Sequence, residues 1–70
     1  MQYHLWKWNN ETDAAEIVRT GTIEECDNME LGADQIAWAI EEFGQCDGGT
    51  ETEWYIITEA GHPAPTKWGE

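Results

Sequence analysis

The sequence predicts a small α+β fold: a two-layer sandwich in which a three-stranded, mostly antiparallel sheet packs against one main helix and one short helix, in the order β-β-α-α-β. Three observations predict it. Apolar and polar residues alternate over residues 2–8 and again over 50–58, which is typical of strands. Residues 33–43 instead repeat apolar side chains at helical spacing. Thr22 and Glu25 match a capping box, which begins a helix.

The length of 70 residues leaves room for one domain, so residues 1–70 are taken as a single unit. A domain this short buries only about 60% of the surface that its unfolded chain exposes. The chain has five tryptophans, and aromatic side chains of this kind bury on the order of 150–250 Å² each. We therefore expect a stable core without disulfides or a bound metal.

Two strands joined by a turn are predicted in the first third of the chain. In the first strand, residues 2–8, the alternation places Trp6 and Trp8 on the same face. Residues 9–13, Asn-Asn-Glu-Thr-Asp, are turn-forming types and predict a hairpin connection. The second strand is expected over about residues 15–20.

Two helices are predicted next. The capping box begins a short helix over residues 23–30, which is expected to end near Gly32. The main helix covers residues 33–43, and Gly44 supplies its stop. The residues that recur on one face of this helix, and that are expected to face the core, are Ala33, Ile36, Ala37, Ile40 and Phe43.

The last third of the chain predicts a turn, a third strand and a tail. Residues 46–50, Cys-Asp-Gly-Gly-Thr, are expected to form the turn. The alternating run over residues 50–58 is the third strand. Residues 61–70 form a C-terminal tail whose two prolines exclude a regular helix or a central strand, although Trp68 in this tail is able to dock on the core.

The charge of the chain is the strongest indication of function. Fifteen Asp and Glu against three Lys and Arg give a net charge of −12, beyond the magnitude of about 2–8 that keeps a small domain soluble. This charge disfavours direct binding to nucleic acid or to anionic lipid, and it favours a basic protein as partner. The sequence contains no apolar run of the length of a membrane span and no signal peptide, so a cytoplasmic location is expected.

Catalytic and metal-binding chemistry is not expected. Cys26 and Cys46 are twenty residues apart and are expected to be reduced thiols, with a disulfide between them as the alternative. Four residues of zinc-ligand type, His4, Cys26, Cys46 and His62, are scattered and lack the close pairs of a zinc site. Because the surrounding carboxylates oppose thiolate formation, neither cysteine is expected to be a nucleophile. We predict no enzyme activity, no metal and no cofactor.

The candidate binding site lies on the main helix, on the side away from its apolar face. The 100° step per residue places Asp34, Trp38, Glu41 and Glu42 there. An aromatic side chain ringed by carboxylates resembles a binding hot spot for a basic partner. The alternative is that the tail or the short helix covers Trp38. Further acidic residues that are expected to extend this face, with the last two about 6.5 Å apart on a strand, are Glu24, Glu25, Asp27, Glu30, Glu51 and Glu53.

The leading hypothesis is a binding inhibitor that occupies a basic, nucleic-acid-binding surface of another protein by phosphate or DNA mimicry, and it requires the carboxylates to gather on one side of the molecule. In composition alone the chain is similar to the small acidic proteins that phages and mobile elements use against DNA-targeting defences, which would act in the host cytoplasm. A second hypothesis is adaptation to high salt. A third is an assembly subunit that forms a homodimer through the first strand as a sheet edge, so a monomer and a homodimer both stay open.

Overall fold

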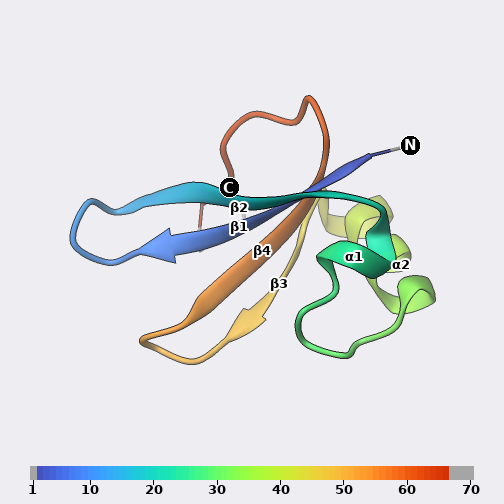
Figure 1. Cartoon of the computed structure of the whole chain (residues 1–70), viewed down its shortest axis with the longest axis horizontal. Coiled ribbons are helices and arrows are strands. Elements are labelled where there is room, and N and C mark those ends of the chain that lie inside the picture. The colour runs from blue at the N-terminus through green and yellow to red at the C-terminus, as the bar shows by residue number, and fades with distance from the viewer. Residues whose placement is uncertain (1, 67–70) are drawn as a thin grey trace.

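Four antiparallel strands form a twisted sheet with both helices gathered at one of its ends (Figure 1). The computed structural model describes residues 2–66. The strand order in the sheet is β2-β1-β4-β3. The elements in chain order are β1 (Tyr3–Asn9), β2 (Ala14–Gly21), α1 (Ile23–Cys26), α2 (Ala33–Phe43), β3 (Cys46–Gly49) and β4 (Trp54–Glu59). The predicted α+β class with an antiparallel sheet and two helices is confirmed, but the sheet has four strands and not three.

The additional strand is β3, in the segment predicted to be a turn. It pairs with β4 from Cys46 opposite Ile57 to Gly49 opposite Trp54. Two glycines made this segment resemble a turn, yet both are closely packed, and Gly49 is required because a side chain there would meet the backbone. A Cβ at Gly48 would lie 3.1 Å from the Met29 sulfur, and a Cβ at Gly49 would meet the backbone carbonyl of Glu53. The prediction was wrong because these glycines allow close approach within a strand.

The start of β4 also differs from the prediction. The strand begins at Trp54, whereas residues 50–53 form the turn between β3 and β4. In this turn the Thr50 N–H donates to the Glu53 carbonyl at 3.1 Å, and the Glu53 N–H donates to the Thr50 hydroxyl at 3.1 Å. Because these local hydrogen bonds satisfy the backbone, the alternating pattern of residues 50–53 does not produce a strand.

The β1–β2 hairpin was predicted correctly, but β1 is a central strand. Its partners are β2 on one side and β4 on the other, so the expectation that the first strand is a sheet edge is wrong. Leu5 pairs with Arg19 and Trp6 with Ile17, which leaves Val18 as the extra residue of a β-bulge. The strand that forms the long edge of the sheet is β2.

Helix α1 begins as predicted and ends earlier. Both hydrogen bonds of the capping box are present: the Thr22 hydroxyl accepts from the Glu25 N–H, and the Glu25 carboxylate accepts from the Thr22 N–H at 2.8 Å. The helix stops at Cys26 and not at residue 30. Beyond it, the Asp27 carboxylate accepts from the backbone N–H groups of Leu31 and Gly32 at 3.0 and 2.9 Å. These bonds hold residues 27–32 in a loop, because a side-chain acceptor competes with the helical pattern.

Helix α2 covers Ala33–Phe43 as predicted and ends at Gly44, which adopts a left-handed conformation with φ of 83°. Ile36 and Ile40 face the core as expected, and Ala39 joins them. Ala37 and Phe43 do not, because both are exposed. Phe43 is the last residue of the helix, and its ring contacts another exposed ring, that of Trp38.

Buried side chains lie on both faces of the sheet, as alternation along the strands requires. The helix-side core consists of Leu5, Cys26, Ile36, Ala39, Ile40, Cys46 and Ile57. The tryptophan cluster on the opposite face consists of Trp6, Trp8 and Ile56, with Trp54 packed against it. The Trp6 indole N–H donates to the buried Thr58 hydroxyl at 2.8 Å, so the polar group of this buried tryptophan is hydrogen-bonded.

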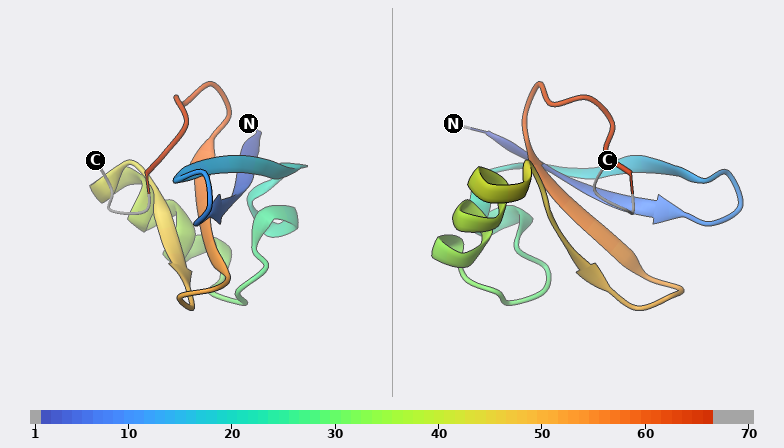
Figure 2. Two further views of the ribbon diagram at one scale, coloured as in Figure 1. Left: turned by 90° about the vertical axis from the view of Figure 1, so that its left-hand side faces the viewer. Right: turned by 180° about the vertical axis from the view of Figure 1, so that it is seen from behind.

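The segment after β4 turns back along the sheet (Figure 2). Pro65 is buried, and the Gln45 side chain donates to the Thr66 carbonyl at 3.0 Å. Trp68, which was expected to be able to dock on the core, lies outside the described residues. Within residues 2–66, neither helix has the length or the apolar character needed to cross a membrane.

Candidate functional site

The most conspicuous surface feature is a pair of exposed aromatic rings on α2. Trp38 is 56% exposed and Phe43 is 67% exposed. Their ring centroids are 5.6 Å apart and their planes make an angle of 87°, which is an edge-to-face contact. Trp38 keeps this exposure beside α1, so the alternative in which the short helix covers it is wrong. Cover by the tail with Trp68 stays a prediction, because residues 67–70 lie outside the described residues. Two large aromatic side chains side by side in solvent are the kind of patch that marks an interaction site.

Carboxylates flank Trp38 along the helix. Asp34 precedes it by one turn, and Glu41 and Glu42 follow it by one turn, so all three are its neighbours on the helix surface. All three are exposed, and α2 contains no Lys, Arg or His. These four residues were predicted to share a face from the sequence. Phe43 belongs with them, and it was missed because its spacing from Ile36 and Ile40 also matches the buried side.

The two glutamates of this face sit where they cost the helix stability. Glu41 and Glu42 lie in the last turn of α2, which has no basic residue. The C-terminal end of a helix carries a partial negative charge, so each carboxylate there is unfavourable by a few tenths of a kcal/mol. Helix stability therefore does not account for their position.

Two of the acidic residues around α1 have a structural role. Glu25 belongs to the capping box, and these hydrogen bonds lower the pKa of its carboxyl group. Both oxygens of Asp27 accept backbone N–H groups, which lowers its pKa as well. These two carboxylates therefore fix the backbone of α1 and of the loop that leads into α2. Glu24 and Glu30, which were predicted with them, are exposed.

Glu51 and Glu53 do not extend the acidic side of α2 around Trp38. They lie in the β3–β4 turn and not on a strand, so the spacing of about 6.5 Å expected for an extended strand does not apply. This turn and the β1–β2 turn project from the end of the sheet opposite the helices (Figure 1). Acidic residues thus occur at both ends of the molecule, and the expected gathering of the charge on one side is wrong. What singles out α2 is its aromatic pair.

A second pair of exposed apolar side chains lies on the edge strand β2. Ile17 is 49% exposed and Val18 is 52% exposed. The bulge at Val18 interrupts the regular spacing of N–H and C=O groups, and such bulges protect an edge from pairing with another chain. The next residue, Arg19, donates to the Glu25 carbonyl at 2.9 Å. This edge is therefore poorly suited to pair with another chain.

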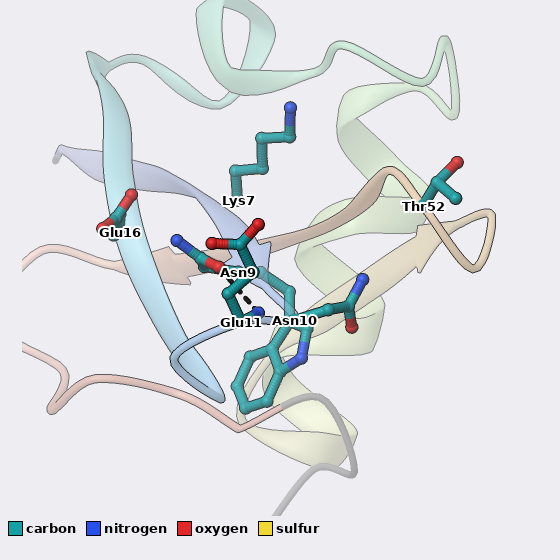
Figure 3. A pocket seen from close by; sticks show the side chains of 7 residues that line it. Lys7, Asn9, Asn10, Glu11, Glu16 and Thr52 are labelled. Carbon is teal, nitrogen blue, oxygen red and sulfur yellow. Dashed lines mark hydrogen bonds between the residues drawn. The ribbon is translucent and has the colours of Figure 1, made fainter.

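A hollow of about 420 Å³ opens between the β1–β2 turn and the β3–β4 turn (Figure 3). The Asn9 side-chain oxygen accepts from the Glu11 N–H at 2.9 Å, and the Asn10 side chain donates to the Glu51 carbonyl at 3.0 Å. Its two asparagines thus hold the turns in place. The residues that line it are Lys7, Trp8, Asn9, Asn10, Glu11, Glu16 and Thr52.

The cysteines belong to the core. Cys26 and Cys46 are both free thiols, and both are buried in the helix-side core. Burial raises the pKa of each thiol, and the negative charge of Asp47 raises that of Cys46 further. Thiols of this kind are inert, because the thiolate is the reactive form. Among residues 2–66, no three His, Cys, Asp or Glu side chains meet in a way that would hold a metal ion.

Comparisons of this chain with protein-family models, with curated proteins and with solved structures gave no match.

Proposed function

We propose that this protein is an acidic binding protein that docks the exposed face of α2 onto a basic protein and thereby inhibits it. The observation that carries this proposal is the exposed Trp38–Phe43 pair with Asp34, Glu41 and Glu42 around Trp38. We call these five residues the α2 face. An apolar anchor that loses water on binding, surrounded by charges of one sign, is the usual composition of an energetic hot spot with its rim.

The two components of the face have different roles in binding. The net charge of −12 attracts a positively charged partner over a distance of about one Debye length, roughly 8 Å at physiological salt, and so raises the association rate. The aromatic pair supplies short-range affinity, since burial of apolar area is not screened by salt. A tryptophan at the centre of such a contact commonly contributes 2 kcal/mol or more, on the order of a thirtyfold change in affinity.

The partner surface that fits this charge best is one that otherwise holds nucleic acid. Such surfaces are lined with Lys and Arg that neutralise phosphates, and their affinity is dominated by this electrostatic attraction. The carboxylates lie at both ends of the molecule and do not gather on one side, so this proposal does not depend on a one-sided mimic of a phosphate array. It depends on the net charge of −12, which attracts a basic groove in many orientations. The α2 face would then select one of these orientations. Inhibition follows because DNA or RNA cannot occupy the same groove.

The proposal is tested by capture and competition. Immobilised protein is incubated with a lysate of the source cell at about 0.15 M salt, and retained proteins are then eluted with duplex DNA or with RNA. We expect wild type to retain a protein that nucleic acid elutes, and we expect Trp38→Ala to retain much less of it. Val18→Ala, which removes an exposed apolar side chain elsewhere, serves as the matched control. Equal capture by Trp38→Ala, or no elution by nucleic acid, would contradict the proposal.

A further inference from the structure

The rings of Trp38 and Phe43 on α2 meet edge to face and are not stacked in parallel. We call the open angle between the two rings the Trp38 corner. Because the two planes meet at 87°, the edge of one ring points at the face of the other, and the remaining faces are not used by this contact. Both side chains are more than half exposed, so ring surface is available to a ligand. The electron-rich face of an aromatic ring attracts cations, and tryptophan does so most strongly.

Carboxylates stand within reach of the same corner. Residues three and four positions apart on a helix have Cβ atoms about 5–6 Å from each other, so Glu41 and Glu42 on one side of Trp38 and Asp34 on the other can contact a group placed on its ring. The cations among the described residues, Lys7 and Arg19, lie on β1 and β2 and not on α2. The helix itself thus provides no competing cation for these carboxylates.

We infer that the Trp38 corner is an arginine-binding site, in which a guanidinium group of the partner stacks on the indole and donates a pair of hydrogen bonds to a neighbouring carboxylate. This inference rests on the proposed function and names the chemistry of its contact. A guanidinium is planar and weakly hydrated, so it stacks on an aromatic face and binds a carboxylate with two parallel hydrogen bonds. A lysine ammonium is more strongly hydrated and lacks this geometry. The corner therefore prefers arginine over lysine at equal charge.

The test compares two synthetic peptides of equal length and charge, with several arginines or several lysines separated by Gly-Ser spacers. Each carries a fluorophore, and binding to the full chain is followed by fluorescence anisotropy at about 0.15 M salt. Wild type is expected to bind the arginine peptide at least about threefold more tightly than the lysine peptide. Trp38→Leu is expected to bring this ratio close to one while it keeps salt-dependent binding of both peptides.

Two controls separate the corner from general electrostatics. The double variant Glu11→Gln with Asp13→Asn removes two charges from the β1–β2 turn, at the far end of the sheet, and is expected to weaken both peptides equally with an unchanged ratio. Glu41→Gln with Glu42→Gln removes two charges beside Trp38, and it is expected to reduce the ratio as well. Circular dichroism verifies that each variant is folded.

The outcomes distinguish this inference from the proposed function. Equal and measurable binding of both peptides by wild type would overturn the arginine site and leave the docking of a basic partner intact. A ratio that persists in Trp38→Leu would also overturn the site, because the preference would arise elsewhere. Failure of wild type to bind either peptide, even at low salt, would contradict the proposed function itself.

Discussion

The two sides of α2 contain residues of similar apolar character in opposite environments. On one side, Ile36 is fully buried and Ala39 and Ile40 nearly so, in the helix-side core. On the other side, Trp38 and Phe43 are more than half exposed, although they are the largest side chains of the helix. In a chain of 70 residues, where core volume is scarce, the small Ala39 is buried and these two rings are left in water. The buried side specifies the fold, and the exposed side is available for a partner.

The largest effect is expected on the buried side. Ile36→Ala would remove a fully buried side chain and leave a cavity, at a cost of about 2–5 kcal/mol in the free energy of unfolding. Urea denaturation followed by circular dichroism measures this free energy. If Ile36→Ala does not fold, Ile36→Val can be measured instead, with an expected loss of about 0.5–1.5 kcal/mol. A loss below about 0.5 kcal/mol for Ile36→Ala would contradict the assignment of this side to the core.

The loop that leads into α2 has a smaller, pH-dependent effect. Asp27→Asn would weaken the bonds to the Leu31 and Gly32 N–H groups and cost about 1–2 kcal/mol at neutral pH. Folding lowers the pKa of Asp27 below its ordinary value of 3.8, so the unfolded state binds the proton more readily. The stability contributed by Asp27 is therefore complete above about pH 5 and is lost as the pH falls through 3.8 and below.

This pH effect is measured as the difference in unfolding free energy between wild type and Asp27→Asn at several pH values. The difference cancels the general repulsion among carboxylates, which changes with pH in both proteins. A difference that stays constant from pH 7 to pH 3 would show that the charge of Asp27 is not what holds the loop.

The glutamates beside Trp38 give the sharpest contrast with the buried side, at a smaller magnitude. Glu41→Gln with Glu42→Gln is expected to raise the free energy of unfolding by a few tenths of a kcal/mol per residue, because it removes negative charge from the helix C-terminus. The same variant is expected to bind the arginine peptide less tightly. Thermal denaturation and anisotropy on one sample measure both. Loss of stability, or an unchanged affinity, would contradict the role assigned to these side chains.

Salt is expected to have a small effect on stability. We expect the protein to be folded in dilute buffer. Raising the KCl concentration screens the repulsion that accompanies a net charge of −12, so the melting temperature should rise by a few degrees. Peptide affinity should fall over the same range. A chain that is unfolded until salt reaches molar concentration would instead support adaptation to high salt.

Local signals explain which elements were predictable from the sequence. The capping box of Thr22 and Glu25, the periodicity of α2 and the stop at Gly44 depend on neighbouring residues, and the structure confirms them. The order of the strands in the sheet depends instead on contacts between residues that are far apart in the sequence. Strand β1, at the start of the chain, pairs with β4, near its end. The end of α1 was missed because the hydrogen bonds of a single side chain, Asp27, decide it.

The candidate site was predictable in part for the same reason. The helical repeat placed Asp34, Trp38, Glu41 and Glu42 on one side, but it could not tell whether another segment covers that side. The repeat also assigned Phe43 to the core. The ring is exposed because it lies at the end of the helix and meets Trp38 there, which is a contact that periodicity does not describe.

The most direct test of the α2 face is to measure stability and affinity together in Trp38→Ala, with Val18→Ala as the control. Because Trp38 is more than half exposed and the substitution removes its ring contact with Phe43, the free energy of unfolding should change by no more than about 1.5 kcal/mol. Affinity for the arginine peptide should fall at least about threefold, whereas the control should bind as wild type does. A stability loss above about 2 kcal/mol, or an affinity equal to that of wild type, would show that Trp38 serves the fold and not a partner.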